Sequence, residues 1–364
     1  MRAAARLTRA GHVASRPLVK PSRGVPSRTA RAGVVGLVLV SGVVAGCGQA
    51  PPNPAGTTSL ATPSASPSAT AISSNRPLQP LTGLPAASTA DAARPAVALT
   101  VSGTDPTGLS SADVVYEEIS SPTRYIALYQ SRLSVTVGPI TTTNPTDRGV
   151  LAVLHPLVGY DGADAGYFIR LLDATKIKDA GYSSYPSLYT SGAAGLATTP
   201  QALSAGVHGA TTPPPIFQYR GPATNATTLA ATGVTRPSHF TITIPGQGSQ
   251  TWNFNSHTNR WSPTGSPAFS AANVVIQDVT YKTINIRPKK GIYTSAATVT
   301  GTGHTQVFSG TAPGGTGGTT ATGTWSKPHT TSVTNYFDTT GAPMAFQAGP
   351  TWVILAPPGT HITT

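Results

Sequence analysis

Three short apolar runs, separated by turn-forming residues, begin the folded part of the chain. Residues 96–101 (AVALTV) are apolar apart from one Thr, as expected for a strand that is buried on both faces. Residues 114–119 (VVYEEI) and 124–131 (RYIALYQS) follow, and residues 121–123 (SPT) between them are turn formers. The pattern therefore predicts one strand followed by a β-hairpin.

The next segments mix helical and extended patterns. After a predicted loop at 141–149 (TTTNPTDRG), residues 150–158 and 166–172 are expected to form helix or helix–strand segments of an α/β layer. Pro156 must end or kink the first of them. Residues 211–236 are rich in Pro, Thr and Ala, and are predicted to link two domains.

Beyond this linker, apolar and polar residues alternate in short runs, which is typical of an antiparallel sheet or a barrel-like domain. We therefore expect an α+β fold with an N-terminal α/β-type mixed-sheet domain at 76–220. A mainly antiparallel β domain at 221–364 should follow it. The strands predicted in this second domain are 240–244, 251–255, 260–262, 274–279, 283–286, 297–300, 305–308, 323–326 and 351–355.

An uncharged apolar run with a cysteine directly behind it precedes the folded part. Residues 32–45 follow an Arg-rich stretch and lead into Val44-Ala45-Gly46-Cys47, which has the order of a secretory signal with small residues before the cut. The run of 14 residues is shorter than the ~20 of a spanning helix. We predict that 1–46 is a lipoprotein signal peptide and that Cys47 is acylated. An ordinary signal peptide and an uncleaved anchor are the alternatives.

Residues 47–75 are predicted to be a disordered tether. They carry no charge, have almost no large apolar residues and are rich in Pro, Ser, Thr and Ala. Together with an acylated Cys47, the tether predicts a protein held on the cell membrane by a lipid anchor and facing the extracytoplasmic side. Because Cys47 is the single cysteine, we expect no disulfide in the folded part.

The charge of the chain is concentrated in the export signal. Eight of the 24 Lys and Arg residues lie in 1–46, which holds no acidic residue, so the chain from Cys47 onward has 16 basic and 12 acidic residues. Its net charge is +4 rather than +12, and we expect no nucleic-acid partner. Arg287, Lys289 and Lys290 form a basic turn, which is either solvated or in contact with an anionic polymer or lipid headgroups.

The candidate polar residues lie mainly at the predicted hairpin. Glu117 and Glu118 are adjacent and therefore point to opposite faces of a strand, so they cannot form one carboxylate dyad. Glu118 is expected to pair with Arg124 across the hairpin, at a partly exposed position worth ~0.5 kcal/mol. A ligand-binding role for this pair is the alternative. Asp161 and Asp164 flank Gly162 in a turn, with an acid/base site as the alternative.

Motifs for known catalytic and metal chemistry are absent from the sequence. There is no G-x-S-x-G, H-E-x-x-H or Walker A motif and no Cys/His metal spacing, so we expect no cofactor and no metal. All four tryptophans lie in the second half, at positions 252, 261, 325 and 352. Core anchoring is preferred for them over stacking on sugar rings.

Several segments, taken in order, resemble the YerB-like family of bacterial lipoproteins, a two-domain family of unknown function. The resemblance implies two domains and places Tyr189 in a segment that the family shares. The matching segments are 80–85 (PLTGLP), 94–98 (RPAVA), 108–118 (GLSSADVVYEE), 123–125 (TRY), 138–139 (GP), 188–190 (LYT), 272–275 (ANVV), 323–325 (GTW), 337–338 (FD), 341–343 (GAP) and 349–352 (GPTW).

The chain departs from the family pattern at three places. Residues 141–144 (TTTN) stand where the family has an Arg-bearing segment, and 185–187 (YPS) where it has Pro-His-Asn. Residues 161–164 (DGAD) replace a Gly-Gly-Ser-Pro loop. If the family binds an anion through those Arg and His residues, this member has lost most of the site.

The sequence is most consistent with a non-enzymatic binding or scaffold protein of the cell envelope. An envelope protein or a cell-wall polymer is the expected partner. An envelope hydrolase or transferase that acts on a cell-wall or lipid-linked substrate is the first alternative. A solute-binding protein is the second.

Overall fold

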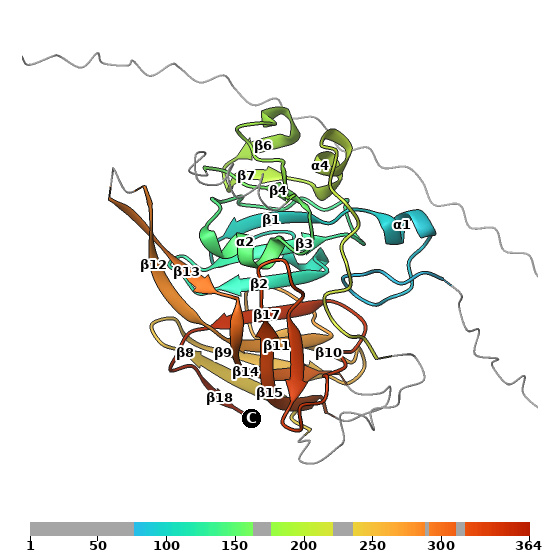
Figure 1. Ribbon diagram of the computed structural model, residues 1–364, viewed down its shortest axis with the longest axis vertical. Helices are drawn as coiled ribbons and strands as arrows, with labels where there is room; N and C mark the ends of the chain where they lie inside the picture. The colour runs from blue at the N-terminus through green and yellow to red at the C-terminus, as the bar shows by residue number, and fades with distance from the viewer. Residues whose placement is uncertain (1–75, 163–175, 221–235, 288–290, 311–316) are drawn as a thin grey trace, which may run out of the picture. The chain divides into compact units, whose positions relative to one another are not determined.

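A ten-stranded mixed sheet is built from apolar runs of both halves of the chain (Figure 1). The computed structural model describes residues 76–364 except 163–175, 221–235, 288–290 and 311–316. The strand order is β16-β15-β14-β11-β17-β2-β3-β1-β4-β5. These strands are β1 (Val97–Ser102), β2 (Val114–Glu118), β3 (Arg124–Tyr129), β4 (Leu157–Gly159), β5 (Lys178–Asp179), β11 (Asn273–Asp278), β14 (Gly301–Ser309), β15 (Thr319–Lys327), β16 (Asn335–Asp338) and β17 (Thr351–Ala356).

The register of the central strands joins the two halves of the chain. β2 and β3 form the predicted antiparallel hairpin, with Val114 opposite Leu128 and Glu118 opposite Arg124. On its other side β2 pairs in parallel with β17, so that Val114 lies opposite Thr351. The division into domains at 76–220 and 221–364 stays a prediction, because residues 221–235 lie outside the described residues.

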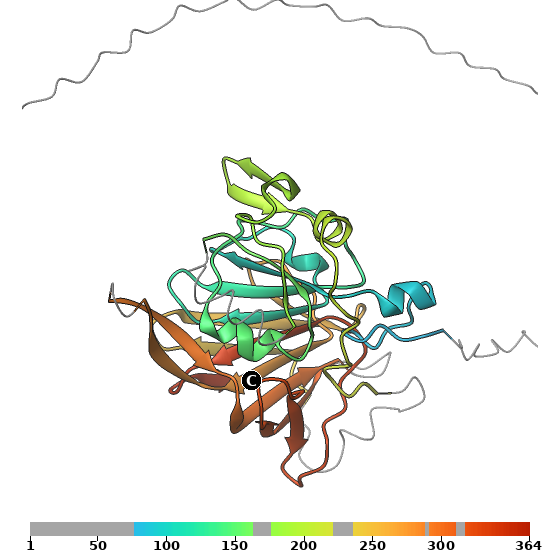
Figure 2. The ribbon, with the colours of Figure 1, turned by 45° about the horizontal axis from the view of Figure 1, so that its top comes forward.

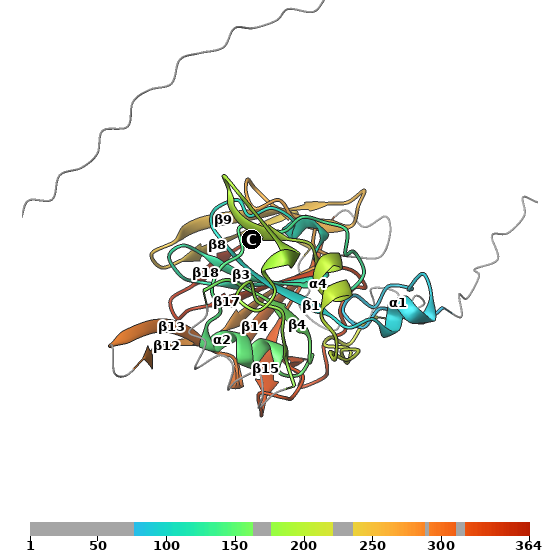
Figure 3. The same ribbon diagram turned by 90° about the horizontal axis from the view of Figure 1, so that it is seen from above.

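A four-stranded antiparallel sheet covers one face of the large sheet (Figure 3). Its order is β10-β9-β8-β18. Between the two sheets, the Phe240 and Phe308 rings stack with centroids 3.7 Å apart, and Trp252 contacts Trp352 edge-on at 5.6 Å. All four tryptophans are buried, which confirms the prediction that they anchor the core. The strands are β8 (His239–Ile244), β9 (Gly248–Asn255), β10 (Arg260–Pro263) and β18 (His361–Thr363).

The opposite face of the large sheet packs against a short helix and a second apolar cluster (Figure 3). Helix α2 (Pro145–Leu151) contributes Val150 and Leu151 to this cluster. The hairpin of β12 (Thr280–Arg287) and β13 (Ile292–Thr298) contacts this helix and projects away from the sheets (Figure 2). The other elements are α1 (Thr89–Ala93), α4 (Pro200–Gly206), the hairpin β6 (Tyr189–Gly192)–β7 (Gly195–Thr198), and 3-10 turns at Leu109–Ser111 and Pro186–Leu188.

The described part of the chain is mostly β, with one large mixed sheet and smaller antiparallel sheets. The helices are short, so the helical layer is thinner than the expected α/β-type domain would have. The segment predicted at 150–158 contains the end of α2 and the start of β4, whereas 166–172 lies outside the described residues. The loop predicted at 141–149 is wrong in its second half, because α2 begins at Pro145.

Candidate functional site

Helix α2 begins at a capping motif that the sequence contains as Asn-Pro-Thr-Asp. The Asn144 side chain accepts a hydrogen bond from Thr146 N at 2.7 Å, and Asp147 Oδ2 accepts one from Asn144 N at 3.0 Å. Pro145 occupies the first helical turn, where its missing N–H is not needed. A capping box indicates the start of a helix, and the loop predicted at 141–149 overlooked it. The capping box places Asp147, which is buried, in the first turn of the helix.

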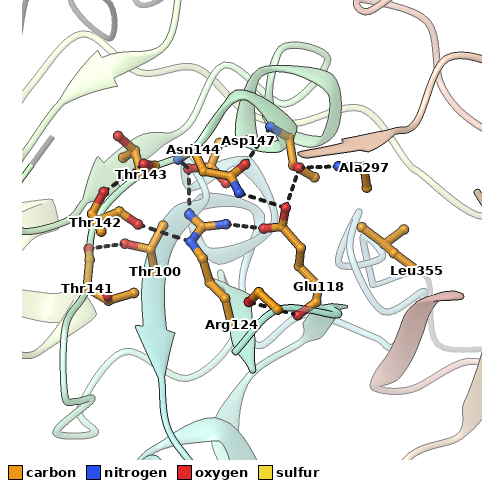
Figure 4. Close-up of polar contacts among 12 residues, drawn as sticks. Thr100, Glu118, Arg124, Thr141, Thr142, Thr143, Asn144, Asp147, Ala297 and Leu355 are labelled. Atoms are coloured by element: carbon orange, nitrogen blue, oxygen red, sulfur yellow. Dashed lines mark hydrogen bonds and ion pairs between the residues drawn. The ribbon is translucent and has the colours of Figure 1, made fainter. Parts of the chain in front are cut away.

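Arg124 is the centre of a polar cluster on the α2 side of the sheet (Figure 4). Its Nη1 donates to Glu118 Oε2 at 2.8 Å, and its Nη2 donates to Asp147 Oδ2 at 2.6 Å. Its Nε donates to Thr142 O at 3.0 Å, so all three guanidinium nitrogens have protein acceptors. The cross-strand pair predicted from the sequence is therefore present, and Asp147 is a further member that sequence reasoning did not find.

Glu118 ties this cluster to neighbouring elements. Its Oε1 accepts a hydrogen bond from Asn144 Nδ2 at 2.7 Å and another from Thr146 Oγ1. Thr146 Oγ1 in turn accepts from Ala297 N at 2.8 Å. The cluster therefore links the β2–β3 hairpin, α2 and β13.

The cluster is buried, which corrects the expected partial exposure of the Glu118–Arg124 pair. Glu118 and Asp147 are 0% exposed and Arg124 is 6% exposed, because α2 and β13 cover the end of the hairpin. Two carboxylates face one guanidinium, and burial raises the pKa of Asp147 to about 6 although Arg124 opposes the shift. Removing one partner of a buried ion pair leaves an uncompensated charge, so such a cluster holds its elements together tightly.

Glu117 points to the opposite face of β2, as predicted from its adjacency to Glu118. Its Oε2 accepts a hydrogen bond from Trp352 Nε1 at 2.8 Å, within the layer between the two sheets. Burial raises the pKa of Glu117 to about 7, and the Trp352 hydrogen bond partly opposes this. The Tyr125 ring lies edge-on to Trp352, with centroids 5.7 Å apart. Glu117 is thus a weakly acidic group in an aromatic environment.

The remaining predicted residues do not join the Arg124 cluster. Tyr189 is buried at the start of β6, where its hydroxyl donates to Ala180 O, and burial raises its pKa. Asp161 N donates to Thr141 O at 2.9 Å. Asp164 lies outside the described residues, as do the predicted lipidation site Cys47 and the cleavage box Val44, Ala45 and Gly46.

The surface has two adjoining hollows of about 310 and 610 Å³ on the C-terminal half. Asp278 and His304 line both hollows, and the exposed Thr322 and Thr324 of β15 line the larger one. Burial raises the pKa of Asp278, while the nearby His304 opposes the shift. These side chains offer hydroxyl, imidazole and carboxylate groups to a hydrogen-bonding ligand. Their spacing carried no recognisable sequence motif.

The described part of the chain contains neither a cluster of metal ligands nor a membrane-spanning helix. Among its residues, no three His, Cys, Asp or Glu side chains lie close enough to share a metal ion. None of its helices is long and apolar enough to span a membrane.

The fold and these sites define a mostly β protein in which one mixed sheet is shared by both halves of the chain. Residues 81–198 match the N-terminal domain, and residues 240–353 the C-terminal domain, of a family described as protein of unknown function (DUF3048). The chain belongs to this family.

A solved structure supports the same assignment. The crystal structure of the YerB protein from Bacillus subtilis is similar to this chain with a TM-score of 0.60. The similarity covers 79% of this chain and 99% of that one at 17% sequence identity, so it shows a shared fold. The resemblance to the YerB-like family is confirmed. No curated protein matches the chain.

Proposed function

We propose that this protein is a membrane-anchored extracytoplasmic lipoprotein that acts as a non-enzymatic binding or scaffold protein of the cell envelope. The observation that carries the proposal is that the hydrogen-bond donors of Arg124 are used within the protein and are not available to a ligand. Its guanidinium nitrogens all donate to acceptors of the protein, and the members of the Arg124 cluster are buried. The cluster therefore favours a framework role over contact with a substrate. The sequence Val44–Cys47 and the uncharged tether behind it support the lipid anchor.

The hollows at Asp278 and His304 are the proposed contact surface for the partner. Thr322 and Thr324 are exposed there, and the larger hollow of about 610 Å³ is within the size range of ligand sites. Hydroxyl and carboxylate groups on a sheet face can hydrogen-bond a cell-wall polymer or a polar protein segment.

Two variants of the full-length protein test the proposal. Cys47→Ala should abolish lipid labelling and move the protein from the membrane fraction to the medium or to an unprocessed precursor. Thr324→Arg should remove the partner that wild-type protein captures from crosslinked membranes. The matched substitution Thr190→Arg, on the exposed end of β6, should leave capture intact. Unlabelled wild-type protein in the medium would refute the anchor, and equal capture by both Thr→Arg variants would refute the surface.

An envelope hydrolase or transferase is the second candidate, and Glu117 is the observation that favours it. A carboxyl group with a pKa of about 7 can exchange a proton near neutral pH. If the protein is such an enzyme, Glu117→Gln should abolish turnover of cell-wall or lipid-linked substrates while partner capture persists. If it is a scaffold, no turnover should be detectable in wild-type protein under the same conditions.

A further inference from the structure

Lys327 is a buried cation that has no carboxylate partner among the residues that the structure describes. It ends β15, is 2% exposed, and donates from Nζ to Ser332 O. Within the described residues, no Asp or Glu lies within ion-pair distance of it. Residues 221–364 contain two acids, Asp278 and Asp338, and the second already accepts hydrogen bonds from its own turn. Burying an ammonium group without a counter-charge is costly, and here it lowers the pKa of Lys327 to about 8.

Lys327 lines a small chamber on the α2 side of the sheet. The chamber has a volume of about 20 Å³, which is room for one water molecule. Tyr116 and Gln277 also line it, and Gln277 Oε1 is held by Tyr336 Oη at 2.8 Å. The polar groups gather here, whereas the other walls are mainly apolar side chains of α2, β17 and the segment around Phe217.

An apolar groove lies directly outside this chamber. It has a volume of about 270 Å³ and is lined by Val333, Met344 and Phe346 among others. Phe217 and Tyr336 line both spaces, and their ring centroids are 6.1 Å apart. These two rings therefore stand where the groove meets the chamber.

We propose that the groove and the chamber together bind an amphiphile with a single carboxylate head, a medium-chain fatty acid. One oxygen of the head, which is about the size of a water molecule, would enter the chamber and accept a charge-assisted hydrogen bond from Lys327. The carboxylate would thereby supply a counter-charge that the described residues do not provide. The chain would lie in the groove against Met344 and Phe346. The groove of about 270 Å³ is slightly smaller than the ~300 Å³ at the lower end of usual ligand pockets, so it suits a chain of medium rather than full length. This site is separate from the hollows at Asp278 and His304.

Decanoate and decanol provide the test, because they share a chain and differ in charge. The assay is calorimetric titration of the unacylated full-length Cys47→Ala protein, so that no detergent competes for the groove. It does not depend on membrane anchoring or on partner capture. The Cys47→Ala protein with Lys327 unchanged should bind decanoate at least about tenfold more tightly than decanol at pH 7. This preference should decline as the pH rises through 8, where free Lys327 loses its charge.

Three variants identify the groups responsible. Lys327→Met should lose the preference for decanoate and, without ligand, should unfold at a temperature about 2–4 °C higher, because a buried charge is removed. Lys282→Met, the same change at an exposed position of β12, should alter neither property. Val333→Trp should block the groove and weaken both ligands, and it tests the site even if Lys327→Met fails to fold. Equal binding of decanoate and decanol by the protein with Lys327 unchanged would overturn the proposal. So would decanoate binding that neither Lys327→Met nor Val333→Trp weakens.

Discussion

Removing the guanidinium at Arg124 is the most direct test of the buried cluster. Arg124→Ala leaves Glu118 and Asp147 at 0% exposure without a counter-charge. Breaking a buried ion pair in this way costs about 3–5 kcal/mol of unfolding free energy, whereas an exposed pair would cost about 0.5 kcal/mol. We therefore expect a loss of about 3–5 kcal/mol at pH 8, measured by urea denaturation with circular dichroism.

The loss should depend on pH in a defined direction. The folded-state pKa of Asp147 is raised to about 6, above its usual value of 3.8, so the stability that its protonated form contributes is lost as the pH rises through 6. Without Arg124 the pKa of Asp147 should rise further, because the opposing positive charge is gone. At pH 5 the Asp147 carboxyl group of the variant is then largely neutral. The destabilisation by Arg124→Ala should consequently be smaller at pH 5 than at pH 8.

Two further variants separate charge from the loss of side-chain contacts. Arg94→Ala removes a pair with Asp91 in which the side chains are 28% and 26% exposed, and it should cost about 1 kcal/mol or less. Asp147→Asn keeps an acceptor oxygen for Arg124 and leaves one carboxylate facing one guanidinium, so it should cost about 1 kcal/mol. A loss below 1 kcal/mol for Arg124→Ala at pH 8, or one equal to that of Arg94→Ala, would refute the assignment of a buried, tightly coupled cluster.

Three other outcomes follow from the geometry. Because the folded pKa of Glu117 is about 7 against a usual 4.5, wild-type stability should fall by up to about 3 kcal/mol as the pH rises from 4.5 to 7. Glu117→Gln should flatten that slope, and an unchanged slope would contradict the shift. Asn144→Ala should cost about 1–2 kcal/mol, more than Ser88→Ala at the exposed cap of α1, when thermal unfolding is compared. Limited proteolysis should cut first within 48–75, and first cuts within 114–131 would contradict the hairpin.

Local pattern was enough to predict many of the strands and the hairpin. The runs at 96–101, 114–119 and 124–131 became β1, β2 and β3, because continuous apolar residues and a Ser-Pro-Thr turn constrain neighbouring residues directly. The opposite directions of Glu117 and Glu118 followed from the two-residue period of a strand. The missed start of α2 also had a local cause, since its Asn-Pro-Thr-Asp cap was present in the sequence.

Tertiary structure decided the environment of each polar group. No local pattern pairs β2 with β17, which is more than 200 residues away, and this pairing places Glu117 against Trp352. Burial of the Glu118–Arg124 pair depends on coverage by α2 and β13, two elements that meet it through long-range contacts. That Lys327 has no carboxylate partner among the described residues likewise depends on which side chains the fold brings near it. Sequence determines which residues can form strands and turns, because those interactions are local. Burial and charge pairing are set by contacts between distant segments, and therefore only the folded chain decides them.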